Sequence, residues 1–177
     1  FNRSQLIYSV YATLHFQRMR KSLVKATVGA KGSKLVGISP SVRKLREDIS
    51  IIAKMELPVL ITGESGTGKE IIASELHKFS NRATKPFQPI NCALLGTLAD
   101  SELFGHAKGS FTGAVSNSNG HVGTAEGGTL FLDEIGELTS DMQAKLLRFL
   151  DSGEYVRVGE SRLRYANVRI VAATNRN

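Results

Sequence analysis

Residues 61–70, with the sequence ITGESGTGKE, have the spacing of a phosphate-binding loop. Gly63, Gly68 and Lys69 fit the pattern G-x-x-x-x-G-K. Glycines let backbone N–H groups turn toward a phosphate, the N-terminus of a following helix adds partial positive charge, and the lysine can reach the outer phosphates. The predicted binding residues of this loop are Gly63, Glu64, Ser65, Gly66, Thr67, Gly68, Lys69 and Glu70.

The residue after the lysine departs from the pattern, because Glu70 stands where a Ser or Thr usually offers a hydroxyl to Mg²⁺. The metal must then be held mainly by phosphates, water and another carboxylate. The segment TLFLDE offers Asp133 at the end of an apolar strand, followed by Glu134. We predict Asp133 as the Mg²⁺ ligand and Glu134 as the catalytic carboxylate that polarises an attacking water. This pairing favours hydrolysis over transfer to a second substrate.

Two asparagines are predicted at the same edge of the sheet, since Asn91 ends one expected strand and Asn175 follows another. Open α/β sheets bind ligands at the carboxyl ends of their strands, where an amide can orient water or sense a γ-phosphate. Isolated asparagines at strand ends are more often turn residues. No chemistry is assigned to the histidines, which show neither metal-ligand spacing nor a nucleophile partner; they are His15, His77, His106 and His121.

The elements that must position these residues alternate between strands and helices. Apolar runs predict strands over 58–62, 86–92, 129–133 and 168–174. Helical patterns cover 39–55, 69–80, 97–104 and 140–153. The first of these helices is capped at Ser39 or Ser41. Such alternation predicts an α/β fold, with a parallel sheet covered by helices on both faces.

Two insertions interrupt this alternation. The stretch 105–128 is rich in glycine, and 155–166 is predicted to be a hairpin that turns at residues 159–161. Within the first insertion, GSFTGA places Phe111 among small and polar residues. We expect this ring to be exposed at the tip of a flexible loop. An exposed aromatic ring suits a transient contact with a partner.

The composition of 177 residues, with 41% hydrophobic and 22% charged, predicts one main globular domain. The formal charge of +7 is uneven, because residues 1–34 carry seven Lys or Arg and no acid. Residues 35–177 carry 16 basic and 16 acidic side chains. We therefore predict a basic linker helix within 1–34, belonging with an upstream regulatory domain, and a main domain over 35–177.

Cys92 is the only cysteine, which excludes an internal disulfide and fits a reducing cytosol. The printed sequence shows no apolar run of about 18 residues and no apolar signal-peptide core at its basic start. We expect a cytoplasmic protein without membrane contact. Because the sequence starts at Phe1 and stops at Asn177, soon after an apolar strand, we also expect a piece of a longer chain.

From about Leu35 to Asn177 the chain resembles the central ATPase domain of NtrC-like bacterial enhancer-binding proteins, the AAA+ activators of sigma-54 RNA polymerase. The segments that carry the resemblance are VGISPSVRKL, GESGTGKE, PINCA, DSELFGH, GSFTGA, GGTLFLDEIGEL, QAKLLRFL, VRVG and NVRIVAATN. The resemblance implies a P-loop NTPase (AAA+) three-layer sandwich that is truncated before the helical lid. It also implies ATP and Mg²⁺ as cofactors.

The corresponding loop of that family, GAFTGA, touches the sigma factor, and its residues map onto Gly109, Phe111, Thr112 and Gly113. The hairpin over 155–166 resembles a second loop that supports the first. Two positions depart from the family, since Ser110 replaces its usual Ala and Ala107 replaces its usual Glu. Glu70 agrees with the family, which commonly has glutamate there. The loop is thus expected to be the output of an ATP cycle.

Further roles follow from the same resemblance. Asn91 is similar to the residue that holds the catalytic glutamate and releases it according to the γ-phosphate. Asn175, with Thr174, looks like the first sensor, and Val36 and Gly37 are expected to line the adenine site.

The resemblance implies sigma-54 RNA polymerase holoenzyme as the partner and a ring homo-oligomer, a hexamer or heptamer. Arginine fingers, second sensor, helical lid and a C-terminal domain that binds enhancer DNA would lie beyond Asn177. Control by a two-component or another signal is expected.

Three alternative functions compete with this one. The first is a phosphotransferase, which needs an acceptor site, and the second is a nucleic-acid-binding module that uses the basic arm. The third is a regulator that binds nucleotide without hydrolysis or with weakened sigma-factor coupling.

Overall fold

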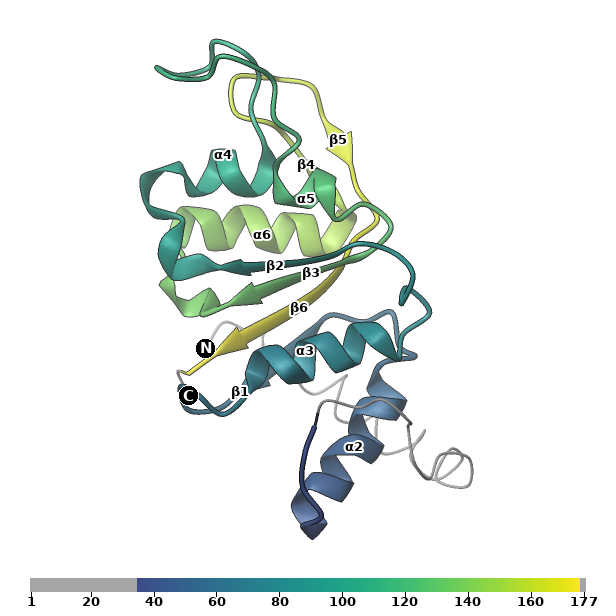
Figure 1. The fold of residues 1–177 in the computed structure, drawn as a ribbon. Coiled ribbons are helices and arrows are strands. Elements are labelled where there is room, and N and C mark those ends of the chain that lie inside the picture. The colour runs from purple at the N-terminus through teal and green to yellow at the C-terminus, as the bar shows by residue number, and fades with distance from the viewer. Residues whose placement is uncertain (1–34, 176–177) are drawn as a thin grey trace.

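The computed structural model describes residues 35–175, so the predicted basic linker helix lies outside the described residues. Its strands form a parallel sheet in the order β1–β6–β3–β2 (Figure 1). The strands are β1 (Val59–Thr62), β2 (Phe87–Asn91), β3 (Thr129–Asp133) and β6 (Arg169–Thr174). All four predicted strands are confirmed, with ends that differ from the prediction by one residue at most.

Helices cover both faces of this sheet, with α2 and α3 on one face and α4 and α6 on the other (Figure 1). Their bounds are α2 (Pro40–Ile52), α3 (Lys69–Lys78), α4 (Ala99–Phe104), α5 (Gly120–Thr124) and α6 (Ser140–Ser152). Within residues 35–175 the structure also has three short 3-10 helices, η1 (Cys92–Leu94), η2 (Gly96–Leu98) and η3 (Ile135–Glu137). The predicted three-layer sandwich is confirmed.

Strand β3 shows why the apolar runs are continuous. Its side chains alternate between the two faces, so that Leu130 and Leu132 join the core under α4 and α6. Phe131 points into the other core, with residues of α2 and α3. A central parallel strand is buried on both faces and therefore reads as an unbroken apolar run rather than an alternating one. The same reasoning applies to β6, whose residues are all buried.

Local signals set the ends of the longer helices. The Ser39 side chain accepts a hydrogen bond of 3.3 Å from the Val42 N–H, and Pro40 occupies the first helical position of α2. Of the two predicted caps, Ser39 is therefore the correct one. In α6, Thr139 is the N-cap, and Gly153 ends the helix in a left-handed conformation with a φ of 74°.

Strand β2 forms one edge of the sheet and contains Pro89, which pairs in register with Phe131. Proline has no N–H, so within sheets it is confined to edge strands and similar positions where a missing donor costs no ladder hydrogen bond. The position of this residue thus agrees with the observed strand order.

Two loops project together from the end of the molecule that lies beyond α4 and α5 (Figure 1). The first, residues 105–119, joins α4 to α5. Its two ends cross at Gly105 and Gly120, where a Cβ on Gly120 would lie 2.3 Å from the Gly105 backbone nitrogen. We call this crossing the neck of the loop. Only glycine allows two backbones to approach so closely, which accounts for part of the glycine-rich composition.

The second loop joins β4 (Glu154–Tyr155) to β5 (Arg164–Tyr165), which pair antiparallel. The predicted hairpin is thus confirmed, but its paired part is only two residues long on each side. The tight turn also lies earlier than residues 159–161, because the Glu160 N–H donates to the Arg157 carbonyl over 3.0 Å. No helix in the described part of the chain is long and apolar enough to cross a membrane.

Candidate nucleotide site and projecting loop

The predicted phosphate loop connects β1 to α3, as its motif requires. Its start is fixed to the sheet, because the Gly63 N–H donates to the Thr174 carbonyl of β6 over 3.2 Å. Gly66 and Gly68 have φ values of 77° and 85°, in the left-handed region that favours glycine. The Thr67 hydroxyl donates to the Glu64 carbonyl over 2.8 Å and closes the loop on itself. The backbone conformation therefore depends on the motif glycines.

Helix α3 begins directly at Lys69, after Gly68 at the N-cap position, and no side chain caps its N-terminus. Uncapped N–H groups and the helix dipole favour an anion at such an end. The Lys69 side chain is only 7% exposed. Its Nζ donates to the carbonyls of Gly63 and Glu64 over 3.0 and 3.1 Å. The ammonium group is thus held inside the loop, beside the uncapped helix end.

Lys69 also faces the carboxylate of Glu134, with 3.6 Å between Nζ and Oε1. Both side chains are largely buried, so this pair interacts more strongly than an ion pair at the surface, although burial of the charges has its own cost. The other carboxylate oxygen of Glu134 accepts a hydrogen bond of 3.2 Å from the Asn175 backbone N–H. Residues that follow β1, β3 and β6 therefore meet at the carboxyl edge of the sheet.

The backbone of Glu134 is strained. With a φ of 51° and a ψ of 49°, it is the one non-glycine residue between 35 and 175 that has a positive φ. The Asp133 carboxylate supports this turn by accepting the Glu134 N–H over 3.0 Å. A non-glycine residue in this region costs free energy, and such residues gather at functional sites. The turn aims the Glu134 side chain at Lys69.

Asp133 ends β3 as a half-buried carboxylate. The charge of Asp133 contributes, after burial, to raising the pKa of the Cys92 thiol to about 12, so this cysteine stays protonated. No cluster of three His, Cys, Asp or Glu that could hold a metal ion occurs among the described residues. One carboxylate beside a phosphate loop suits Mg²⁺, which usually takes its other ligands from phosphates and water.

Asn91 ends β2 in register with Asp133. Its side-chain oxygen accepts the Ala93 N–H over 3.0 Å and thereby caps η1. Within residues 35–175 the structure joins Asn91 to the backbone of η1 and joins Glu134 to Lys69 and Asn175. The two side chains that the family resemblance pairs therefore lie at neighbouring strand ends without a hydrogen bond between them.

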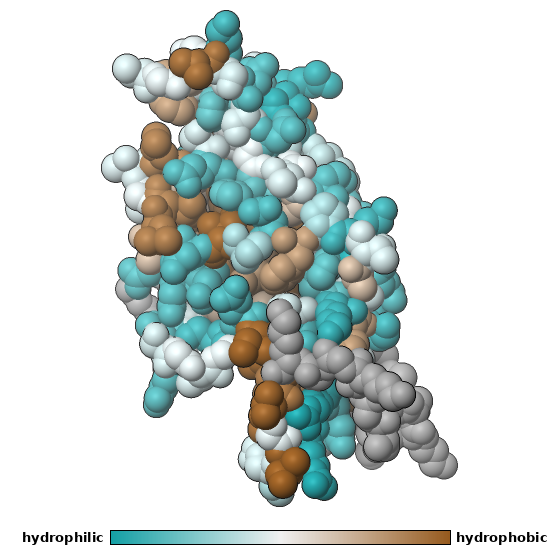
Figure 2. Space-filling model, in the orientation of Figure 1, coloured by the Kyte–Doolittle hydropathy of each residue, from teal (hydrophilic) through white to brown (hydrophobic). Residues whose placement is uncertain are grey.

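Val36 and Gly37 precede α2. Val36 is 93% exposed, and Gly37 packs so closely on Val42 that a Cβ would lie 3.2 Å from it. The neighbouring Ile38 is also exposed. Figure 2 shows apolar atoms at the lower end of the molecule, where α2 begins. An apolar surface of this kind can accept a flat aromatic ring.

The expectation that Phe111 is a bare ring at the loop tip was wrong. Phe111 is half-buried, and its ring packs edge-on against His106, with 5.1 Å between ring centroids and 71° between planes. The neighbouring Thr112 and Gly113 are exposed. The apolar side chain that is most exposed on this loop is Val115, at 80%. Figure 2 shows apolar atoms at the upper tip of the molecule, over this loop.

The two projecting loops pack on one another. The Ala107 N–H donates to the Val158 carbonyl over 3.0 Å, and a Cβ on Gly159 would lie 2.4 Å from the Ser110 Cβ. The Ser110 hydroxyl is buried by this contact and has no hydrogen-bond partner. Ser110 and Ala107, the two departures from the family's loop, therefore both lie at the interface with the second loop.

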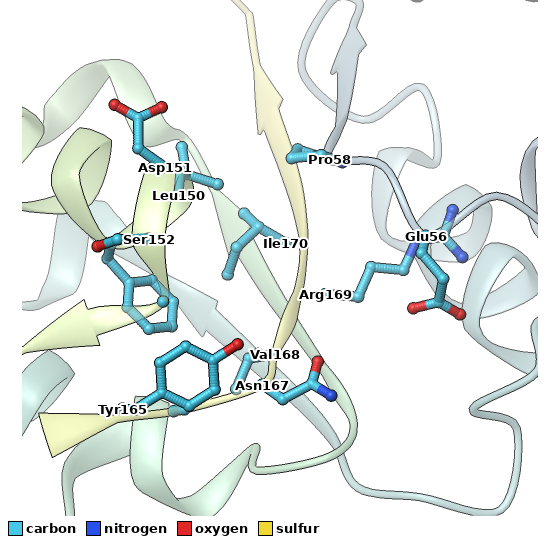
Figure 3. A pocket seen from close by; sticks show the side chains of 13 residues that line it. Glu56, Pro58, Leu150, Asp151, Ser152, Tyr165, Asn167, Val168, Arg169 and Ile170 are labelled. Atoms are coloured by element: carbon cyan, nitrogen blue, oxygen red, sulfur yellow. The ribbon is translucent and has the colours of Figure 1, made fainter.

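A hollow of about 230 Å³ lies at the amino ends of the strands, whereas the phosphate loop lies at their carboxyl ends (Figure 3). It lies between the end of α6, Pro58 before β1 and the start of β6. The buried Arg169 lines it and donates to the carbonyls of Ala53 and Ile52, over 2.8 Å in each case. None of the predicted site residues lines this hollow, so we do not assign the nucleotide to it.

The fold and the site together define the class of protein. A phosphate loop between a parallel strand and a helix, with a carboxylate pair at the end of a nearby strand, is the arrangement of a P-loop nucleoside triphosphatase. The family model of the sigma-54 interaction domain matches residues 35–177. The chain therefore belongs to this family, which forms the AAA+ central domain of sigma-54-dependent transcriptional activators.

Individual relatives are similar to this chain. The anaerobic nitric oxide reductase transcription regulator NorR of Escherichia coli (strain K12 / DH10B) is 51% identical over 148 residues, which cover 83% of this chain and 29% of NorR. The crystal structure of NtrX from Brucella abortus in complex with ATP matches with a TM-score of 0.73 and 30% identity, over 100% of this chain and 40% of that one.

A more distant match shows the fold alone. It is the P-loop NTPase domain of the sigma-54 transport activator from E. coli, with a TM-score of 0.52 and 18% identity, over 80% of this chain and 79% of that one. The matched part of this chain covers only 29% of the length of NorR.

Proposed function

We propose that this domain hydrolyses ATP and uses the hydrolysis to move the GSFTGA loop, which remodels sigma-54 RNA polymerase for open-complex formation. The observation that carries the proposal is the meeting of Lys69 and Glu134, with 3.6 Å between Nζ and Oε1, beside the uncapped N-terminus of α3. NtrX, which is 30% identical, has been solved in complex with ATP, which supports the same ligand here.

In this proposal, backbone N–H groups of residues 63–70 and the Lys69 ammonium bind the phosphates, and Val36 and Gly37 lie against the adenine. Bound Mg²⁺, held by Asp133, would neutralise phosphate charge. Once Lys69 turns to a phosphate, Glu134 is free to accept a proton from a water molecule. The oxygen of that water bonds to the γ-phosphorus while the bond to the β-phosphate oxygen breaks, giving ADP and phosphate.

The coupling would run through the chain between the site and the loop. Asn91 caps η1, and η2 and α4 lead from there to the neck of the loop. Asn175, whose N–H binds Glu134, would sense the γ-phosphate from the other side. A change at the strand ends that moves α4 would thus move Phe111 and Thr112, which we propose as contacts of the sigma factor together with Gly109 and Gly113.

We further propose a ring homo-oligomer, a hexamer or heptamer, whose neighbouring subunits supply arginine fingers. Enhancer DNA would bind to a C-terminal domain of the whole protein, and an upstream domain of a two-component or other signal pathway would control it. NorR is named as a transcription regulator, which supports a role in transcription for the whole protein.

The test uses the full-length protein, purified sigma-54 and an ADP–metal-fluoride mimic of the transition state. ATP turnover and sigma-54 capture are measured for the parent, Lys69→Ala, Glu134→Gln and Phe111→Ala. We expect Lys69→Ala to lose both activities and Glu134→Gln to lose turnover by about 10²- to 10⁴-fold, as for the loss of a general base. Phe111→Ala should keep turnover and lose capture.

Turnover that survives Glu134→Gln would contradict the catalytic assignment. A parent protein that hydrolyses ATP and never captures sigma-54 would favour the alternative, a nucleotide-dependent regulator with weakened coupling to the sigma factor. The buried, unpartnered hydroxyl of Ser110 is the structural feature that would then be examined first.

A further inference from the structure

We propose that His106 is a positioning residue that holds the Phe111 ring against the base of the first loop, so that the ring becomes available only when His106 moves. The proposal rests on the proposed function for what Phe111 is released to contact. The contact between the two rings can be tested without any partner.

The half-buried Phe111 ring is in contact with the ring of His106. Their centroids are 5.1 Å apart and their planes are inclined by 71°. An edge-to-face arrangement at this distance is attractive, because the positive edge of one ring meets the negative face of the other. The loop thus keeps its aromatic side chain folded back, whereas Thr112 at the same tip is exposed.

The His106 ring is itself fixed. A hydrogen bond of 2.7 Å joins its Nδ1 to the hydroxyl of Ser101, which lies on α4 and is only 7% exposed. A histidine held at one ring nitrogen has a defined orientation. The Ser101 hydroxyl does not take part in the ring contact and fixes where the imidazole points. It is therefore the anchor of the arrangement.

The backbone of His106 is fixed as well. Its N–H donates to the Ser118 carbonyl over 3.2 Å, and its carbonyl accepts the Ser118 N–H over 2.9 Å. The next residue, Ala107, donates to Val158 of the second loop. His106 therefore lies where α4, the returning end of the first loop and the second loop meet. A shift of α4 would carry both the anchor and the ring.

The strength of the contact sets the expected effect. Aromatic pairs contribute about 0.5–1.5 kcal/mol beyond their buried area, which corresponds to an increase of roughly 2- to 10-fold in the released population when the pair is lost. Cleavage by a protease reports this population when opening is fast relative to cleavage. Chymotrypsin cuts after aromatic residues, so cleavage between Phe111 and Thr112 reports release of the ring.

The experiment measures this cleavage in the full-length protein by mass spectrometry for the parent, His106→Gln, Ser101→Ala and His121→Gln. The glutamine at 106 can still bind Ser101 and has no ring, whereas Ser101→Ala keeps both rings and removes the anchor. His121 is the matched control, since it lies in α5 and its Nδ1 lies 3.1 Å from the Gln88 amide. ATP turnover and melting temperature are followed in parallel.

We expect both His106→Gln and Ser101→Ala to raise cleavage after Phe111 by roughly 2- to 10-fold, with the control at the parent rate and turnover unchanged. Should His106→Gln fail to fold, Ser101→Ala decides the question alone. Parent-like cleavage in Ser101→Ala would overturn the proposal. Faster cleavage in a protein that never captures sigma-54 would leave the positioning role standing and would reject the proposed function, so the two failures can be told apart.

Discussion

At the scale of single residues, Glu134 combines a carboxylate that faces Lys69 with a backbone conformation that is unfavourable for its residue type. The strain of its φ of 51° is offset by three contacts. The Asp133 carboxylate accepts the Glu134 N–H, and the Glu134 carboxylate binds the Asn175 N–H and faces Lys69. Strain of this kind is retained where the surrounding structure over-determines it. We infer that stability has been given up at this position so that the carboxylate faces the phosphate loop.

This inference predicts that Glu134→Gly is more stable than Glu134→Ala by about 1 kcal/mol, because both lose the carboxylate and only glycine relieves the strain. Urea denaturation of the 177-residue chain measures the difference. The matched pair at Glu137, in the following 3-10 turn, should show the opposite order, with alanine more stable by about 0.5–1 kcal/mol. The same order at both positions would contradict the strain.

His77 is a second residue with a consequence for stability. It is buried, its Nδ1 lies 3.0 Å from the Thr129 hydroxyl, and burial lowers the pKa of its ring below 6.5. The unfolded chain then binds a proton that the folded protein does not. Stability should therefore fall as the pH drops through 6.5, the ordinary value, with a slope of at most about 1.4 kcal/mol per pH unit for one proton.

Equilibrium unfolding between pH 7.5 and about 5 tests this dependence on His77. His77→Gln should flatten the slope, whereas Ile90→Val, a comparable loss in the core, should lower stability and keep the slope. An unchanged slope in His77→Gln would assign the proton to another group.

At the scale of elements, the neck of the first loop shows how close packing fixes a projecting segment. A Cβ on Gly105 would lie 2.4 Å from the Ser118 carbonyl oxygen, and Gly105 has a φ of 86°. Gly109 has a similar φ of 80°, with nothing within 4 Å of its Cβ position. A side chain would be strained by the positive φ at both positions, but only at Gly105 would its Cβ also collide with another part of the backbone.

We therefore predict that Gly105→Ala destabilises the protein more than Gly109→Ala does. Hydrogen exchange over residues 105–120 should rise strongly for Gly105→Ala, because the backbone bonds at His106 and Ser118 must break to admit the methyl group. Gly109→Ala should change exchange only near residue 109. Equal effects of the two variants would show that φ alone accounts for both.

The same elements show what could be predicted from the sequence. The strands β3 and β6 are apolar because helices cover both faces, and that signal is local and strong. Strand β1 was predicted from a similar apolar run, although its Leu60 is 61% exposed. Helix α5 was missed, since its five residues, GHVGT, have little helical propensity and are held by the neck. The exposure of Phe111 was also predicted wrongly. Its contact with His106 depends on how the loop folds back, which the spacing of the two residues in the sequence does not show.

More of the candidate nucleotide site than of the projecting loop could be predicted from the sequence. The motif and the strand ends identify Lys69, Glu134 and Asn175 as neighbours, because parallel strands end at one edge. The left-handed turn at Glu134 and the use of the Asn175 backbone rather than its amide could not be predicted. Both depend on distances between side chains that sequence spacing does not contain.

At the scale of the whole molecule, the phosphate loop and the projecting loops lie at separate ends, with α4 and the sheet between them (Figure 1). The matched part of this chain covers 29% of the length of NorR. The family resemblance assigns arginine fingers to residues beyond Asn177. In the proposed ATPase, the described residues supply the phosphate loop and the carboxylate that faces it.

We predict that the 177-residue chain alone turns ATP over at least about 10³-fold more slowly than a chain extended through the arginine fingers, since such an arginine contributes 10³- to 10⁵-fold. Phosphate release at matched concentrations measures both. Brisk turnover by the short chain that is abolished by Glu134→Gln would contradict this prediction.

Pro89 affects how copies of this domain can associate through the free edge of β2. A free strand edge is a template on which a second sheet can grow, and such growth leads to aggregates without a defined size. Proline interrupts the row of donors along the outer side of β2. This edge is thereby unfavourable for fusion between sheets, so that copies of this domain that come together, as in the ring we propose, would keep separate sheets.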